Sequence, residues 1–267
     1  MTGPPIDLTV SDFHERAGEV VSIEVVSADG STPREAGAWM LANAAGETFR
    51  TIGGGRLEHD AVVAARAMLV EGVEERMMDV ALGPAIGQCC GGRVALRLRR
   101  SDDVDVSFWM MEREHEEART RPQVIVFGHG HVGQALAAVL RMQPVRLHVV
   151  ETRPDFGGAG VSVTPLPEEV VDAAPPGAAY LVLTHDHALD YLIVDRILAR
   201  GDAAYVGLIG SKTKRATFAS RMKRDGHPPE RFEAVTCPIG TQAPRDKRPE
   251  VIALFAAAEV TRALLQR

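Results

Sequence analysis

A glycine-rich turn between a short apolar run and an Ala/Leu-rich segment constrains the fold of this sequence more than any other feature. Apolar residues at 124–127 predict a buried strand, and the turn at 128–133 has the spacing G-x-G-x-x-G. A segment of helical period follows, and a second apolar run at 147–150 completes the unit. This order of parts predicts the first βαβ unit of a doubly wound parallel sheet, and therefore an α/β protein with a Rossmann-like domain.

The three glycines of the turn have different expected roles. Gly128 permits the tight turn, Gly130 lets the backbone approach an anion, and Gly133 lets the helix pack on the strand. Glu151 follows Gly133 by 18 residues, at the end of the second strand, where a carboxylate can receive a ribose 2′-hydroxyl. The turn is therefore a candidate dinucleotide site.

Other residues of the same unit leave the ligand open. Arg153 lies two residues after Glu151, so the choice between NAD and NADP is not fixed. His129 and His131 are bulky at positions where dinucleotide turns favour small side chains. The alternative is a Rossmann fold whose pyrophosphate site is empty or serves another ligand, because one fold hosts many functions.

The length of 267 residues allows two ordinary domains. A charged segment at 105–120 predicts an exposed helix that ends before a proline. We place the domain boundary there, with an N-terminal α+β domain at 1–120 and the Rossmann-like domain at 121–267. Within the second domain, residues 155–176 are rich in Gly and Pro, which predicts an irregular segment with a short strand near 161–164.

Composition argues against several classes of function. The net charge is −6, with both signs interspersed, so we expect no nucleic-acid-binding surface. No apolar run approaches the roughly 20 residues that span a bilayer, and the first residues lack the features of a secretory signal. Three cysteines, two of them adjacent, do not suggest a disulfide framework. We therefore expect a cytoplasmic protein with free thiols and no membrane contact.

A second strand-to-helix junction, at 210–215, also carries groups suited to an anion. Ser211 and Lys212 precede further cations near the expected start of a helix, on the carboxyl edge of the same sheet. The spacing of a P-loop is absent. The alternative is ordinary helix capping with solvated basic residues, but the shared sheet edge favours an anion site.

Three consecutive glycines precede a helix in the first domain. Gly53, Gly54 and Gly55 lose much conformational entropy on ordering, so their presence needs a reason. Backbone amides there can approach a ligand, and Arg56 is a candidate contact for an oxyanion or a phosphate. A plain strand-to-helix connection is the alternative.

The sequence T-H-D-H-A-L-D around His185 and His187 is close to the T-H-x-H-x-D-H pattern of metallo-hydrolases but does not match it. These two side chains could meet His129 and His131 at one sheet edge as metal ligands. The alternative, which we favour, is that the histidines are polar donors lining a cleft and that Asp186 caps its helix.

Thiols occur at two places. Cys89 and Cys90 lie in a glycine-flanked loop, where thiolates would be accessible as soft metal ligands or sulfur carriers. The alternative is a pair of small buried apolar residues. Cys237, between an expected strand and Pro238, is a second candidate at the carboxyl edge of the sheet.

Taken together, these motifs resemble the XdhC/CoxI family of xanthine dehydrogenase accessory proteins. The resemblance covers nearly the whole chain in the same order. Its N-terminal part is carried by G-S-T-P-R at 30–34, I-G-G-G-R-L-E at 52–58 and C-C-G-G at 89–92. Its C-terminal part is carried by F-G-H-G-H-V-G at 127–133, T-H-D-H-A-L-D at 184–190, Y-V-G-L-I-G-S at 205–211 and C-P-I-G at 237–240.

The resemblance implies a dedicated chaperone and no turnover of a substrate. Members of the family bind the molybdenum cofactor, a molybdopterin carrying Mo, and hold it while a cysteine desulfurase supplies the terminal sulfido ligand. They then deliver it to apo xanthine dehydrogenase or a related hydroxylase. This implies that the glycine turns at 128–133 and 210–215 bind the pterin phosphate, and that Cys89 or Cys90, in preference to Cys237, contacts Mo.

Two other functions remain open from the residues alone. One is an NAD(P)-dependent oxidoreductase that uses the G-x-G-x-x-G turn, and the other is a metal-dependent hydrolase built on the histidines. For the chaperone we also expect a homodimer. The candidate cofactor-binding residues are Gly53, Gly54, Gly55, Arg56, Cys89, Cys90, Gly128, His129, Gly130, His131, Gly133, Glu151, His185, His187, Ser211, Lys212 and Cys237.

Overall fold

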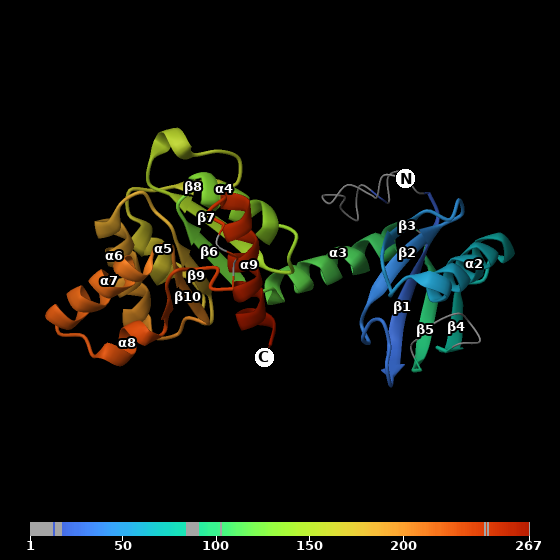
Figure 1. Cartoon of the computed structure of the whole chain (residues 1–267). Helices are drawn as coiled ribbons and strands as arrows, with labels where there is room; N and C mark the ends of the chain where they lie inside the picture. Colours follow the sequence, from blue (N-terminus) through green and yellow to red (C-terminus); the bar gives the residue numbers. More distant parts are fainter. Residues whose placement is uncertain are drawn as a thin grey trace. The chain divides into compact units, whose positions relative to one another are not determined.

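A computed structural model describes Phe13 and residues 18–83, 91–101, 103–242, 244 and 246–266. The chain divides into two compact units, Met1–Glu117 and Ala118–Arg267, and Figure 1 shows the elements of each. The sequence placed the boundary near residue 120. Both units mix helices and strands, so the predicted α/β class is confirmed.

The first unit is built on a five-stranded antiparallel sheet in the order β3-β2-β1-β5-β4. The first four residues of its long central strand are buried, and exposure rises from Glu24 toward Asp29. The strands are β1 (Val20–Asp29), β2 (Trp39–Asn43), β3 (Thr48–Arg50), β4 (Glu75–Ala81) and β5 (Arg93–Ser101).

Two helices belong to this sheet. α2 (Gly55–Glu71) covers one face with Leu57, Ala61 and Met68, which pack with inward residues of the strands. Its left-handed C-cap, Gly72, ends it. On the other face, α3 (Asp103–Thr120) is held by charge: Arg113 pairs with Glu24, and Glu117 pairs with Arg50.

The second unit is a six-stranded parallel sheet in the order β11-β10-β9-β6-β7-β8. Read from β8, this is the order 3-2-1-4-5-6 of the doubly wound Rossmann fold, so the predicted domain type is confirmed. The strands are β6 (Gln123–Phe127), β7 (Arg146–Glu151), β8 (Val161–Val163), β9 (Ala179–Val182), β10 (Tyr205–Leu208) and β11 (Val235–Thr236).

Helices cover both faces of the parallel sheet. One apolar core contains α5 (Pro167–Ala173), α6 (His187–Arg200), α7 (Lys212–Arg224) and α8 (Pro229–Glu233), and the other contains α4 (His131–Leu140) and α9 (Pro249–Leu265). A 3₁₀ turn, η2 (Pro154–Phe156), follows β7. None of the helices in the part of the chain that the structure describes is long and apolar enough to cross a membrane.

One prediction for this unit was wrong. The segment 155–176 was expected to be irregular apart from a short strand, and β8 is that strand, but α5 lies there as well. Pro167 occupies the first helical position, and Glu168 and Glu169 lie in the first turn, where acids interact well with the helix dipole.

Candidate functional site

The carboxyl edge of the parallel sheet is the place where this fold binds ligands. The chain builds the sheet outward from β6 through β7 to β8, and then from β9 through β10 to β11 on the other side. The order therefore reverses between β6 and β9, and doubly wound folds generally bind their ligands outside the strand ends at such a switch point. The loops after β6, β7, β9 and β10 carry most of the residues that the sequence singled out.

The glycine turn after β6 divides its three glycines into two kinds. A Cβ on Gly128, whose φ is +111°, would lie 2.3 Å from the carbonyl oxygen of Leu183, and one on Gly133 would lie 2.0 Å from that of Gly128. Gly130 has no such neighbour: a Cβ there would meet nothing within 4 Å. Packing thus requires two of the glycines, whereas Gly130 leaves open space beside the start of α4.

Glu151, at the end of β7, is committed to contacts within the protein. Its side chain is 2% exposed, and it accepts hydrogen bonds from the backbone N–H groups of His129, Thr152 and Arg153 at 2.9–3.1 Å. The guanidinium of Arg153 donates two more, at 3.1 and 3.0 Å. Burial alone would raise the pKa of Glu151, but the bonds from Arg153 and the backbone outweigh it and lower that pKa to about 2.

We call the hydrogen bonds that Glu151 accepts from Arg153 and from the backbone the Glu151 clamp. Neighbouring contacts connect this clamp to the glycine turn. The guanidinium of Arg153 lies 3.7 Å from the ring centroid of Phe156, and the Phe156 carbonyl oxygen lies 2.9 Å from Nδ1 of His129. The segment after β7 is therefore fastened to the turn after β6 through His129. The sequence indicated Glu151 and His129 separately, but gave no sign of Arg153 and Phe156 as the groups that join them.

The loop after β9 exposes its histidines and buries an acid. Asp186 caps α6 by accepting a hydrogen bond from the N–H of Ala188 at 2.6 Å, as predicted. His185 is exposed, and so is the side chain of His187. Asp190, with 0% exposure, accepts hydrogen bonds from the backbone N–H and the hydroxyl of Thr184.

The four histidines do not assemble a metal site. Within the described ranges, no group of three or more His, Cys, Asp or Glu side chains is placed to hold a metal ion. His131, His185 and His187 instead lie exposed, with His129 half-buried beside Phe156. Their role as polar donors lining a cleft stays a prediction.

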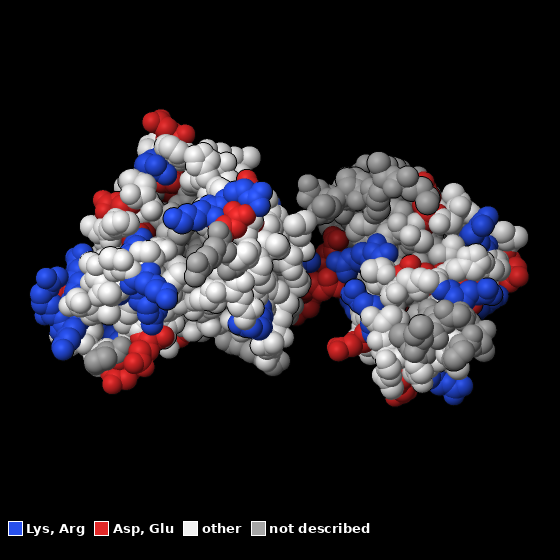
Figure 2. Space-filling model, in the orientation of Figure 1, with Lys and Arg blue, Asp and Glu red and all other residues white. Residues whose placement is uncertain are grey.

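The loop after β10 distributes its cations among different tasks. Ser211 caps α7 by accepting from the N–H of Lys214 at 3.2 Å. The Lys214 ammonium lies 2.6 Å from the buried Asp190 carboxylate, and Arg215 donates to the carbonyl oxygen of Val235. Lys212 is exposed at the first position of α7, the helix over which blue basic side chains gather in Figure 2. Sequence reasoning missed the Asp190–Lys214 ion pair, because no short-range pattern relates the two residues.

Cys237 is part of the core on one face of the sheet. Its side chain is 6% exposed and packs among apolar residues of the second unit. Burial raises the pKa of its thiol, although Lys214 and Arg215 act in the opposite direction. A buried thiol that resists deprotonation is a poor metal ligand, so the chemistry of this group does not fit a contact with molybdenum.

In the first unit, the residues singled out around the start of α2 are mostly engaged. The Glu58 carboxylate accepts from the N–H groups of Ile52 and Gly53 at 2.9 and 3.2 Å. Arg56 pairs with Asp60 one turn along α2, at 2.7 Å. A Cβ on Gly54 would meet nothing within 4 Å. Cys89 and Cys90 lie outside the described residues.

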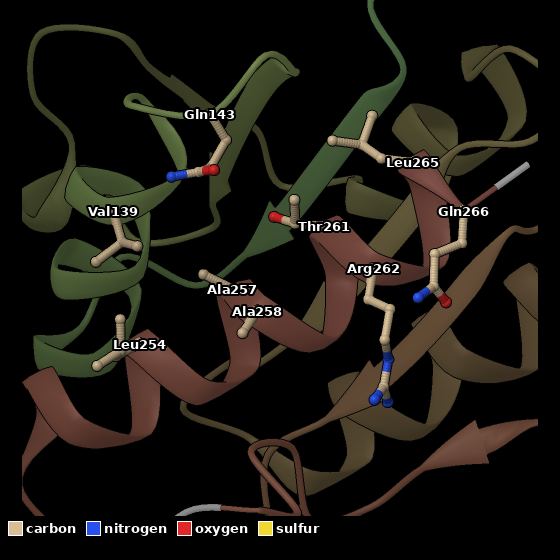
Figure 3. Close-up of a pocket in the computed structure, with 9 residues that line it drawn as sticks. All are labelled: Val139, Gln143, Leu254, Ala257, Ala258, Thr261, Arg262, Leu265 and Gln266. Carbon is tan, nitrogen blue, oxygen red and sulfur yellow. The ribbon is translucent and has the colours of Figure 1, made fainter. Parts of the chain in front are cut away.

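A pocket of about 460 Å³ lies away from these loops, between α4 and α9 (Figure 3). Val139, Leu254 and Leu265 give it a largely apolar lining, with Arg262 as its charged residue. α4 begins at the carboxyl edge and runs back along β6, so its last turn near Val139 lies toward the opposite edge. The pocket is therefore separate from the loops at the switch point.

Comparison with known proteins identifies the family. Residues 124–260 match the model of the XdhC Rossmann domain, and residues 14–80 match the model of the XdhC and CoxI family. The chain belongs to the XdhC and CoxI family. The resemblance seen in the sequence motifs is thereby confirmed, and the Rossmann sheet described above is the family's own C-terminal domain.

A solved structure supports the fold over nearly the whole length. The protein of Bacillus halodurans, described as a xanthine dehydrogenase, is similar to this chain with a TM-score of 0.75 and 17% sequence identity. The match covers 93% of this chain and 92% of that one. At this identity the likeness establishes the shared fold. No curated protein sequence matches the chain.

Proposed function

We propose that this protein is a carrier of the molybdenum cofactor. It binds the cofactor, holds it while a cysteine desulfurase supplies the terminal sulfido ligand, and inserts it into apo xanthine dehydrogenase or a related molybdenum hydroxylase. The observation that carries the proposal is the match of both units to models of one family, which supports an accessory role in relation to xanthine dehydrogenase. In this role the protein turns over no substrate of its own.

The open part of the sheet edge has the chemistry that a pterin phosphate needs. Gly130 precedes α4 without a side-chain cap, and the space beside it is open. Backbone N–H groups at a helix start attract an anion, and the exposed Lys212 and His131 offer further donors. Exposed groups suit a carrier, because cargo held at an accessible edge can be passed on.

The soft ligand for Mo must come from another place than Cys237. The remaining thiols are Cys89 and Cys90, which we propose as the contacts to molybdenum. The buried Cys237 supplies a matched control in the same chain. Replacing it changes the number of thiols without removing a proposed contact.

The proposal is tested by asking whether the purified protein carries the molybdenum cofactor. The protein is purified from a host that makes the cofactor, and its molybdenum content and the fluorescence of the oxidised pterin are measured. We expect Mo and pterin together in stoichiometric amounts, a large loss of Mo in the variant Cys89→Ala/Cys90→Ala, and unchanged Mo in Cys237→Ala. Wild-type protein that carries neither Mo nor pterin would refute the proposal, and unchanged Mo in the double variant would refute the role of those thiols.

We also propose that the carrier works as a homodimer. Light scattering of the purified protein should then give twice the mass of one chain. A monomer that still carries and transfers the cofactor would show that self-association is not part of the function.

A further inference from the structure

A Rossmann turn that binds a dinucleotide has two requirements. The pyrophosphate lies on the helix start after the first strand, and a free carboxylate at the end of the second strand receives the hydroxyls of the adenosine ribose. In this chain the first place is the turn around Gly130, and the second is Glu151 at the end of β7. Whether the pyrophosphate position and the ribose position are open to a ligand are therefore two separate questions.

The carboxylate of Glu151 has no acceptor capacity left for a ribose. A carboxylate has about four lone-pair positions, and that of Glu151 accepts five hydrogen bonds. With 2% exposure it also presents almost no surface to a ligand. A ribose hydroxyl could bind there only if Arg153 first left.

Arg153 is held on its other side as well. Its guanidinium lies 3.7 Å from the ring centroid of Phe156, a contact with cation–π attraction. The Phe156 carbonyl oxygen is fixed in turn by Nδ1 of His129 at 2.9 Å. The arginine is thus kept in place by the Glu151 carboxylate and the Phe156 ring, and Phe156 is in turn bonded to His129 of the glycine turn.

We propose that Arg153 is a specificity-determining residue that occupies the ribose position and closes this Rossmann turn to NAD and NADP. For NAD, the guanidinium takes the hydrogen bonds that the ribose hydroxyls would make. For NADP, the 2′-phosphate would find the same guanidinium already neutralised by the Glu151 carboxylate, whose charge repels it. The proposal concerns the turn itself and does not depend on which cargo the protein carries.

Titration with nicotinamide nucleotides tests the proposal. NADH and NADPH are added to the full-length protein, and binding is followed by the fluorescence of the reduced nicotinamide. We expect no saturation up to about 1 mM for the wild type, and binding of NADH at least roughly tenfold tighter in Arg153→Ala, in which Glu151 loses the two guanidinium bonds and keeps the three from backbone N–H groups. Arg146→Ala removes an exposed arginine at the start of β7, which donates a hydrogen bond to Gln123, and should behave as the wild type.

A second variant separates the loss of the guanidinium from a loss of folding. Arg153→Met removes the guanidinium but keeps an unbranched side chain against Phe156, and thermal unfolding reports whether each variant is folded. Saturable micromolar binding of NADH or NADPH by the wild type would overturn the proposal. Folded Arg153→Ala and Arg153→Met proteins that still fail to bind NADH would overturn it too, because Arg153 would then not be the barrier.

Discussion

The two glycine-rich turns of this protein, one in each unit, look alike in sequence and are stabilised in different ways. Each precedes a helix whose N-cap is a glycine, Gly54 for α2 and Gly130 for α4, without a side-chain cap. Each also has a glutamate that accepts from the backbone of the turn, from two N–H groups in the first unit and from one in the second. For α2 this is Glu58, and for α4 it is Glu151.

The difference lies in where the glutamate comes from. Glu58 belongs to the first turn of the helix that it stabilises, and it is partly exposed. Glu151 comes from the neighbouring strand, is 2% exposed, and joins the turn to β7. A local clamp orders only its own turn, whereas the clamp on α4 couples the glycine turn to the sheet. Loss of the Glu151 contacts should therefore lower the free energy of unfolding more than loss of the Glu58 contacts.

The largest effect is expected at Gly133. In Gly133→Ala the new Cβ would lie 2.0 Å from the carbonyl oxygen of Gly128, and backbone cannot rotate away as a side chain can. We expect the free energy of unfolding to fall by about 3 kcal/mol or more, beyond the cost of ordinary overpacking. Chemical denaturation measures it.

The matched control is Gly130→Ala, three residues earlier in the same turn. Its Cβ would meet nothing within 4 Å and its φ is −73°, so stability should change by less than about 0.5 kcal/mol. Equal destabilisation by the two substitutions would contradict the division of the glycines into packed and open positions. Because Gly130 faces the proposed ligand, its alanine variant should instead retain less cofactor.

The next largest loss of stability is expected from removing the charge of Glu151. In Glu151→Gln the paired Arg153 loses its carboxylate, and we expect a loss of about 2–3 kcal/mol near neutral pH. The folded-state pKa lies below the usual 4.5, at about 2, so the ionised group stabilises the fold above pH 4.5 and loses its contribution as pH falls toward 2. The difference in stability between wild type and variant should therefore shrink through that window. A difference that is constant from pH 5 to pH 2 would contradict the role of ionisation.

A smaller effect is expected at Gly53 in the first unit. Its φ is +129°, and a Cβ would lie 2.5 Å from Cγ of Pro33, so Gly53→Ala should cost about 2 kcal/mol. Gly54→Ala, with φ of +80° and ψ of −175°, a region adopted almost only by glycine, but with open space around the Cβ, should cost about 1 kcal/mol. The difference between the two melting temperatures measures the contact with Pro33, and a reversed order would contradict it.

Of the two glutamates, Glu58 is expected to give the smaller effect. Glu58→Ala frees two backbone N–H groups and the Thr51 hydroxyl, most of which water can reach, so we expect a loss of about 1 kcal/mol. Thermal unfolding of this variant beside Glu151→Gln compares the two clamps directly. A greater loss for Glu58→Ala would reverse the comparison of local and tertiary clamps.

Local patterns were enough to predict the frame of the second unit. The strands at β6 and β7, the glycine turn between them and the helix cap at Asp186 follow from short apolar runs, glycine spacing and turn chemistry. These signals act within a few residues of each other, so they can be seen in one sequence. The α5 helix was missed because the glycines and prolines around it concealed its own start signals, Pro167 and two acids.

Contacts across loops could not be predicted in the same way. Lys214 reaches Asp190 from a different helix, and Glu151 accepts from the N–H of His129 in the turn 22 residues earlier. Glu259 is an intermediate case: a single acid within the apolar segment of α9 indicates a buried partner. It accepts from the N–H groups of Gly240 and Thr241, in the loop after β11.

Transfer of the cofactor tests the central claim most directly. Protein purified with its cargo is mixed with apo xanthine dehydrogenase that lacks molybdenum, and the gain of hydroxylase activity is followed together with the movement of Mo between the separated proteins. We predict that activity appears in proportion to the Mo that leaves this protein, and that Cys89→Ala/Cys90→Ala protein supports little of it. Protein that carries Mo and pterin yet neither transfers Mo nor activates the apoenzyme would contradict the claim.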